Sequence, residues 1–302
     1  MTTNDAALGR TPSPSSSPSP SPGPAPVARH LPGLTGVFYD GWVVTVRNLR
    51  RMTRIPEMVV FATIQPIMFV LLFAFVFGGA IPVSGGGGTH AYREYLLPGI
   101  FTQTLAFTTG TTAVGLADDL HKGLVDRFRS LPMARSAVLL GRTVADWIQN
   151  LFVLLIMALC GLAVGWRIHG GFWKAVAAFL LVMLFSYAMS WIGAVIGLSV
   201  STPETANTAG FIWLFPVTFV SNAFVPTSSL PGWLQPVAEW NPISSTVLAL
   251  RQLFGNPTGY APGKLPNVLP MQHPAWVSLA WSILILALFV PLAVRKYRSV
   301  SA

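Results

Sequence analysis

Long runs of apolar residues without a charge recur along this chain. Each run has about 20 residues, the length of a helix that crosses the hydrocarbon core of a lipid bilayer. A charge at the centre of such a helix costs about 2.5 to 3.5 kcal/mol on insertion scales, so repeated charge-free runs are rare in soluble proteins. The pattern predicts an all-α polytopic membrane protein with six transmembrane helices, at residues 58–78, 95–117, 147–165, 175–199, 205–225 and 275–294.

Composition and charge agree with a membrane location. Only 10% of the 302 residues are charged, against about 25% in an ordinary soluble domain. The net charge of +9 does not predict a nucleic-acid partner, because Lys and Arg are concentrated in alternate loops between the spans. By the positive-inside rule these loops face the cytoplasm, which places both termini there. We therefore expect a lipid bilayer around the chain and no nucleic acid.

The chain before the first span has two parts. Residues 1–35 are rich in Ser and Pro, and we expect a disordered cytoplasmic tail because this composition cannot bury a core. Residues 36–55 combine apolar residues at helical spacing with a separate basic face, which predicts an amphipathic helix at the membrane interface. The basic face either holds anionic lipid headgroups or contacts a cytosolic partner. It consists of Arg47, Arg50, Arg51 and Arg54.

The loop between the fifth and sixth spans carries its own pattern. Leu230, Trp233, Val237 and Trp240 recur at helical spacing, while prolines divide the loop into short pieces. We expect short re-entrant helices that dip into the outer interface with their Trp rings at headgroup level. Another short helix is predicted over residues 244–254.

The sequence argues against catalysis by this chain. Its histidines are scattered without an H-E-x-x-H spacing, so no metal site is predicted, and no G-x-x-x-x-G-K-S/T motif is present. Any ATP must therefore be hydrolysed by another chain. The six spans also lack Asp, Glu and Lys, which argues against an ion-coupled carrier. Arg142 and Asp146 are spaced for an ion pair, which we interpret as structural rather than as a proton relay.

Uncharged polar and aromatic residues form stripes within the spans. In the second span the stripe is a row of threonines, and in the fifth it mixes aromatic and amide groups. Such stripes serve either as helix-packing faces or as the lining of a transport pathway. A glutamine beside Pro66 is a further candidate, although a helix kink also explains that position. The candidate pathway residues are Gln65, Gln103, Thr104, Thr108, Thr111, Phe211, Phe215, Thr218 and Asn222.

The cytoplasmic loop between the second and third spans predicts a short amphipathic helix. Leu124, Phe128 and Leu131 repeat on one helical face, and Pro132 ends the helix. A helix of this size is too short for a domain but suits docking into a partner's groove. The docking residues are Lys122, Gly123, Leu124, Asp126, Arg127, Phe128, Arg129 and Leu131.

Three stretches resemble the type-two ABC export permeases, in particular the drug-export branch typified by actinobacterial daunorubicin-resistance permeases. They are RIPEMVVFATIQPIMFVLLFAFVFG (54–78), KGLVDRFRSLPMARSAVLLGRTVADW (122–147) and FVPTSSLPGWLQPVAEWNP (224–242). The resemblance covers about residues 36–298, so residues 36–302 are expected to be the transmembrane domain of a bacterial cytoplasmic-membrane protein.

The resemblance also implies partners and a mechanism. It implies a second permease copy or a sister permease, and a separate ABC ATPase that carries the ATP and Mg. Residues 122–130 are implied to be the coupling helix, and residues 36–55 the connecting helix on the inner membrane surface. The chain would export a hydrophobic or amphipathic compound by alternating access. An ATP-independent channel or facilitator for small uncharged solutes is the alternative, and a membrane-embedded enzyme comes after it.

Overall fold

The computed structural model describes residues 39, 41–46, 56–76, 89–122, 135–261 and 265–300. The predicted tail, residues 1–35, lies outside this part of the chain. So do Arg47, Arg50, Arg51 and Arg54, although residues 41–46 of the same predicted helix are helical.

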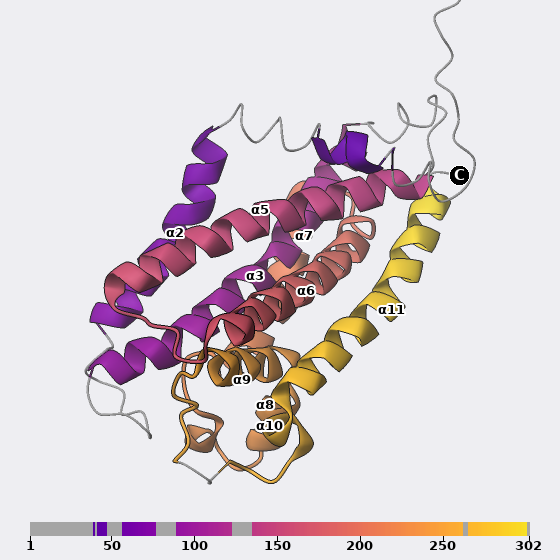
Figure 1. Ribbon diagram of the computed structural model, residues 1–302. Coiled ribbons are helices and arrows are strands. Elements are labelled where there is room, and N and C mark those ends of the chain that lie inside the picture. The colour runs from indigo at the N-terminus through magenta and orange to yellow at the C-terminus, as the bar shows by residue number, and fades with distance from the viewer. Residues whose placement is uncertain are drawn as a thin grey trace, which may run out of the picture. The chain divides into compact units, whose positions relative to one another are not determined.

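The described residues form helices and no strand (Figure 1). Proline lies in the first turn of several of these helices, and Gly255 ends one helix in the left-handed conformation that glycine adopts without strain. The long helices are α2 (Pro56–Phe75), α3 (Thr89–His121), α5 (Arg135–Val164), α6 (Phe172–Gly197), α7 (Pro203–Phe219), α9 (Pro242–Phe254) and α11 (Pro274–Val300). The short ones are η1 (Thr227–Ser229), α8 (Gln235–Trp240) and α10 (Leu269–Gln272).

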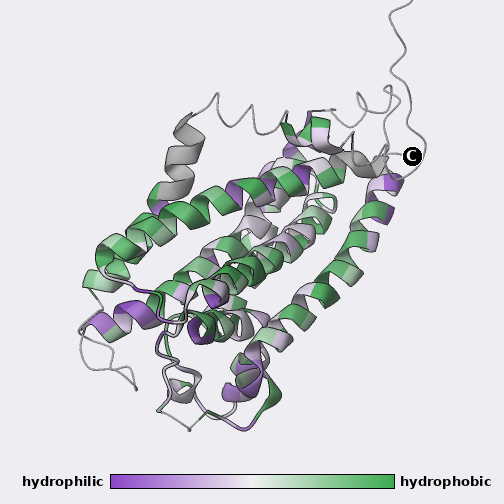
Figure 2. Cartoon of the chain, in the orientation of Figure 1, coloured by the Kyte–Doolittle hydropathy of each residue, from purple (hydrophilic) through white to green (hydrophobic). Residues whose placement is uncertain are grey.

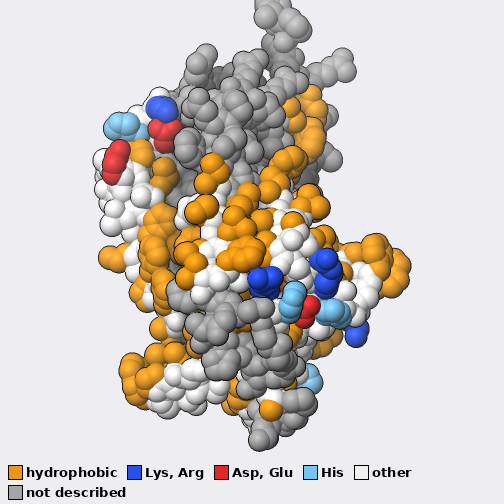
Figure 3. Space-filling model, turned by 90° about the vertical axis from the view of Figure 1, so that its left-hand side faces the viewer, with side chains coloured by type: hydrophobic (Ala, Val, Ile, Leu, Met, Phe, Trp, Pro, Cys, Tyr) orange, Lys and Arg blue, Asp and Glu red, His pale blue; other side chains and the backbone are white. Residues whose placement is uncertain are grey.

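Within the described residues, three helices are long and apolar enough to cross a membrane: Leu139–Val164 in α5, Phe172–Gly197 in α6 and Pro274–Ser299 in α11. Hydrophobic residues run along all three (Figure 2). The described apolar part of α2 is only Ile64–Phe75, and α7 has 17 residues, about 25 Å of helix. The space-filling view shows a hydrophobic region across the middle of one face, with charged side chains gathered above and below it (Figure 3).

Helix α3 is the centre of the packing, since it contacts α2, α5, α6, α7 and α9. Its approach to α6 depends on two glycines spaced four residues apart. A Cβ on Gly193 would lie 2.2 Å from the Thr109 carbonyl oxygen, and one on Gly197 would lie 2.5 Å from that of Ala113. Small residues at this spacing let two helix backbones come close, as is common between helices in membranes.

The helix boundaries correct the sequence expectation at the fifth span. That span was predicted to run to residue 225, but α7 ends at Phe219. The side-chain amide of Asn241 donates hydrogen bonds to the carbonyls of Val217 and Val220, at 2.6 and 3.3 Å. Because these free carbonyls are satisfied by Asn241, the N-cap residue of α9, the end of α7 depends on a residue far along the chain. Asn222 is therefore not on a helical stripe with Phe211 and Phe215.

Candidate functional site

A cavity of about 250 Å³ lies between α2, α3, α5 and α7. Among the residues that the structure describes, no Asp, Glu, Lys, Arg or His lines it. Its polar lining residues are Gln65, Gln103, Thr104, Thr108, Thr111, Gln149 and Asn150, and its aromatic ones are Phe69, Phe73, Phe107, Phe211, Phe215, Phe219 and Phe224. The cavity is therefore neutral, with amide and hydroxyl groups set among aromatic rings.

The threonines of α3 divide into two groups with different surroundings. Thr108 and Thr111 line the cavity, and their hydroxyls donate to carbonyls of their own helix at 2.6 and 2.9 Å. Thr109 donates both to the Ala106 carbonyl of its own helix at 2.8 Å and to the Met189 carbonyl of α6 at 3.1 Å, and Thr112 donates to the Asp146 carboxylate of α5 at 2.7 Å. One face of α3 thus lines the cavity while another packs against its neighbours.

The aromatic residues of the cavity contact one another as a connected set. Phe107 of α3 lies 5.5 Å from Phe211 and 5.3 Å from Phe215 of α7, between ring centroids. Phe73 of α2 stacks on Phe224 at 5.0 Å. Rings at these separations attract each other beyond their area burial and are also surfaces for an aromatic ligand.

The structure places most of the sequence-predicted pathway residues together. Gln65, Gln103, Thr104, Thr108, Thr111, Phe211 and Phe215 all line the cavity, whereas Thr218 and Asn222 do not. Both of the latter are buried, and their side-chain polar atoms have no hydrogen-bond partner among the described residues.

Sequence reasoning missed the contribution of α5 to the cavity. Gln149 and Asn150 line it, and the Asn150 amide also donates to the Ser186 hydroxyl at 2.8 Å. The signal was an adjacent Gln-Asn pair at the start of an otherwise apolar span.

A charged cluster joins α3 to α5 beside the predicted docking loop. The Arg142 guanidinium lies 3.4 Å from a carboxylate oxygen of Asp119 and 3.4 Å from one of Asp146, and all three side chains are less than one fifth exposed. The ion pair predicted from the spacing of Arg142 and Asp146 is therefore present. Because Asp119 lies on α3, the cluster ties together the two helices that flank residues 123–134.

Lys122 is the one described residue of the predicted docking helix. It lies just beyond the end of α3, exposed, and its ammonium group contacts the Asp118 carboxylate at 2.7 Å. The remaining predicted residues, Gly123, Leu124, Asp126, Arg127, Phe128, Arg129 and Leu131, lie outside the described part of the chain.

A fully buried arginine lies at the Phe224 end of the cavity. Arg251 of α9 donates to the Tyr95 carbonyl at 2.8 Å and to the Ala223 carbonyl at 3.1 Å. Within the described residues no carboxylate lies within salt-bridge distance of it. Burial raises the pKa of the nearby Tyr260 hydroxyl, so this group is no anionic partner either. Arg251 is thus held by carbonyl groups rather than by opposite charge.

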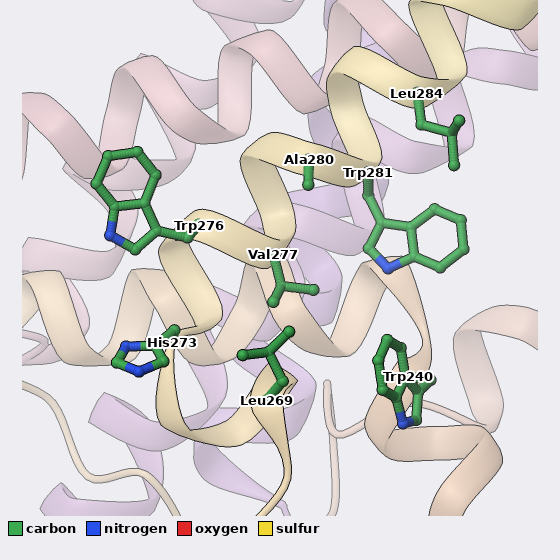
Figure 4. Close-up of a pocket in the computed structure, with 8 residues that line it drawn as sticks. All are labelled: Trp240, Leu269, His273, Trp276, Val277, Ala280, Trp281 and Leu284. Carbon is green, nitrogen blue, oxygen red and sulfur yellow. The ribbon is translucent and has the colours of Figure 1, made fainter.

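A second hollow lies away from this cavity, on α8, α10 and α11 (Figure 4). It has about 640 Å³ and is lined mostly by apolar groups. Trp276 and His273 lie on one side of it and Trp281 with Trp240 on the other, while Val277 points between them (Figure 4). Trp276 is largely exposed and Trp240 is half-exposed, as expected for rings at a membrane interface.

Comparison with known proteins decides the family. The family model described as ABC-2 type transporter matches residues 39–254. The chain belongs to the ABC-2 type transporter family. A daunorubicin resistance ABC transporter permease protein of Streptomyces coeruleorubidus is 32% identical over 256 residues, which are 85% of this chain and 85% of that protein. A probable doxorubicin resistance ABC transporter permease protein of Mycobacterium tuberculosis is 26% identical over 257 residues, 84% of this chain and 87% of its own.

Membership in the ABC-2 family has direct consequences for the site. The chain is a membrane transport subunit, so it is not itself the ATPase. The family match includes α2, α3, α5 and α7, the helices that enclose the neutral cavity. It also includes the loop at residues 123–134, where the docking helix is predicted.

Proposed function

We propose that this chain is the membrane-spanning permease subunit of an ATP-driven exporter of hydrophobic or amphipathic compounds, such as drugs, antibiotics or lipid-like molecules. The observation that carries the proposal is the uncharged cavity lined by phenylalanines, amides and hydroxyls, in a chain with drug-resistance permeases among its relatives. Aromatic rings would contact the apolar body of the cargo, and the few polar groups would orient it.

The proposed topology uses α2, α3, α5, α6, α7 and α11 as six spans, with both termini in the cytoplasm. Helix α11 supports it, because exposed Trp276 is near one end and Arg295, Lys296 and Arg298 are near the other. From Trp276 to Arg295 the helix rises about 28 Å, close to the roughly 30 Å of a hydrocarbon core. Trp rings would lie at the outer interface and the basic residues at the inner one.

The size of the cavity supports a pathway shared with a second subunit. Its volume of about 250 Å³ is below the roughly 300–1,000 Å³ of pockets that enclose drug-sized ligands. Phe215 and Phe219, which line it, are 47% and 61% exposed on the surface of α7. A second permease copy or a sister permease packed against this side would bury these rings and enlarge the space.

Energy would come from a separate ABC ATPase, which holds ATP and Mg. In the proposal, residues 122–131 dock into it, with Phe128 and Leu131 making apolar contact and Arg127 and Arg129 orienting the helix. The Arg142 cluster would hold α3 and α5 together beside this loop, because it joins the two helices that flank it.

A transport assay in inside-out vesicles tests the proposal. Vesicles containing this chain and its candidate ATPase should accumulate doxorubicin on addition of ATP and Mg, and Phe211→Ala should reduce the rate several-fold. Phe172→Ala is the matched control, because Phe172 is 73% exposed and does not line the cavity. Accumulation that continues at the same rate without ATP would favour the facilitator instead.

A further inference from the structure

The Phe224 end of the cavity is closed by a short segment between α7 and α9. Residues 221–224 follow the end of α7, and Phe224 packs on Phe73 at 5.0 Å and on Phe219 at 6.0 Å between ring centroids. All three rings line the cavity. Phe224 therefore occupies the boundary between the cavity and the buried polar region around Arg251.

The backbone of this segment is held by side chains from two helices. From α9, Arg251 donates to the Ala223 carbonyl at 3.1 Å, and the Ser244 hydroxyl accepts from the Asn222 amide N–H at 3.0 Å. From α3, the Tyr95 hydroxyl donates to the Asn222 carbonyl at 3.1 Å. These bonds replace the helical ones that the segment lacks beyond Phe219.

The contact with α3 is a close one. A Cβ on Gly99 would lie 2.1 Å from the Ala223 carbonyl oxygen, so the segment lies directly against the helix backbone at this glycine. The Arg251 guanidinium also lies over the Tyr95 ring, 3.5 Å from its centre. Arg251 and Tyr95 thus hold residues 221–224 against α3 through their hydrogen bonds to the backbone of the segment.

Several polar atoms around the segment are buried without a hydrogen-bond partner among the described residues. They are both side-chain polar atoms of Asn222, the Thr218 hydroxyl, the Tyr92 hydroxyl and one guanidinium nitrogen of Arg251. Burying such groups unpaired costs free energy, whereas exposing them to water recovers it. The hydrogen bonds to the backbone of the segment therefore stabilise the closed arrangement, whereas its unpaired polar side chains destabilise it. Two opposing contributions of this kind are expected in a segment that opens.

We propose that residues 221–224 are a movable seal at the outer end of the cavity and that Arg251 is the positioning residue that keeps it shut. This inference rests on the proposed function, because it makes the seal the outer barrier of the export pathway. In the open arrangement the side chains of Asn222 and Thr218 would face water, which explains polar residues at positions that do not line the closed cavity.

Accessibility of an introduced cysteine tests the seal. In a Cys160→Ser background, Asn222→Cys should react slowly with a membrane-impermeant thiol reagent added to intact cells. Adding Arg251→Gln should speed the reaction about tenfold or more, because it removes at least one hydrogen bond that holds the segment. Equal rates with and without Arg251→Gln, or no reaction from outside in either case, would overturn the proposal.

Two further variants keep the result interpretable. Ser190→Cys, at a fully buried position of α6, should stay unreactive in both backgrounds, and a parallel increase there would mean that Arg251→Gln loosens the whole protein. Tyr95→Phe removes only the hydroxyl that holds the Asn222 carbonyl and should raise the Asn222→Cys rate without disturbing folding. Labelling is measured without ATP, so a chain that does not export would still show the difference in labelling rate. Conversely, equal labelling rates would refute the seal without refuting ATP-driven export.

Discussion

The guanidinium of Arg251 lies 3.5 Å from the centre of the Tyr95 ring and donates a hydrogen bond to the backbone carbonyl of the same residue. The contact joins α9 to α3 over a sequence separation of 156 residues, and both side chains are fully buried. A cation held against an aromatic face in a dry environment is worth about 2 kcal/mol. It stabilises the packing of the loop between α7 and α9 as well as of α3.

Replacing Arg251 by lysine should therefore destabilise the protein although the charge is kept. Lysine has no planar fork, so it cannot donate to Tyr95 and Ala223 together, and an unmet buried carbonyl costs about 1–3 kcal/mol. We expect Arg251→Lys to lower the Tm by several degrees in a detergent-based thermal unfolding assay. Arg295→Lys, at an exposed position of α11, should change it little; equal Tm values for both variants would contradict the role given to Arg251.

The polar groups of the cavity should matter for cargo handling rather than for folding. Gln103→Leu removes an amide from the lining at nearly constant volume. We expect a several-fold lower rate of ATP-driven transport with an unchanged Tm. Gln272→Leu, at an exposed position of α10, is the control. Normal transport of a range of amphipathic compounds by Gln103→Leu would show that Gln103 has no role in the transport pathway.

The charged cluster should behave as a structural joint. Asp146 accepts hydrogen bonds from Thr112 and Arg142, so Asp146→Asn should cost about 1–3 kcal/mol of stability. Thr112→Val combined with Asp146→Asn should cost less than the sum of the two single changes. Transport per inserted molecule should persist. Loss of transport at full stability would instead favour the proton-relay interpretation.

The docking helix gives a prediction about coupling. Phe128→Ala should leave the chain inserted, and its ATPase should still hydrolyse ATP, but export should fall to background because the apolar contact is lost. Phosphate release and doxorubicin accumulation, measured on the same vesicles, check this. Export by Phe128→Ala at the wild-type rate would contradict the assignment of residues 122–131 as the coupling helix.

The six-span topology can be tested with single cysteines. In a Cys160→Ser background, Gln272→Cys before α11 should react with an impermeant reagent added to intact cells, whereas Ser299→Cys at its other end should react only after permeabilisation. Both positions are exposed. The reverse pattern would invert the proposed orientation.

The sequence predicted the elements of this fold better than their junctions. Helix α6 agreed closely with its predicted span because its apolar run lies between Gly171 and a break after Gly197. The end of α7 could not be predicted, because the group that satisfies its last carbonyls is Asn241, more than 20 residues further along.

The site was predicted in part for a similar physical reason. Helical spacing shows which residues of one helix share a face, so the Thr108 and Phe211 stripes were visible. Helical spacing does not show which faces of different helices pack together. Gln149 and Phe224 were therefore not predicted to line the cavity. The burial of Arg251 could not be predicted either, because it depends on Tyr95, 156 residues away.

The dependence of this chain on a separate ATPase is tested most directly by tagging the chain in its own host, purifying it in mild detergent and identifying the copurifying proteins by mass spectrometry. We expect a stoichiometric P-loop ATPase that is lost when Arg127, Phe128 and Arg129 are replaced together, while the membrane domain stays folded. A folded, active preparation without any ATPase would contradict this dependence and would indicate an ATP-independent facilitator.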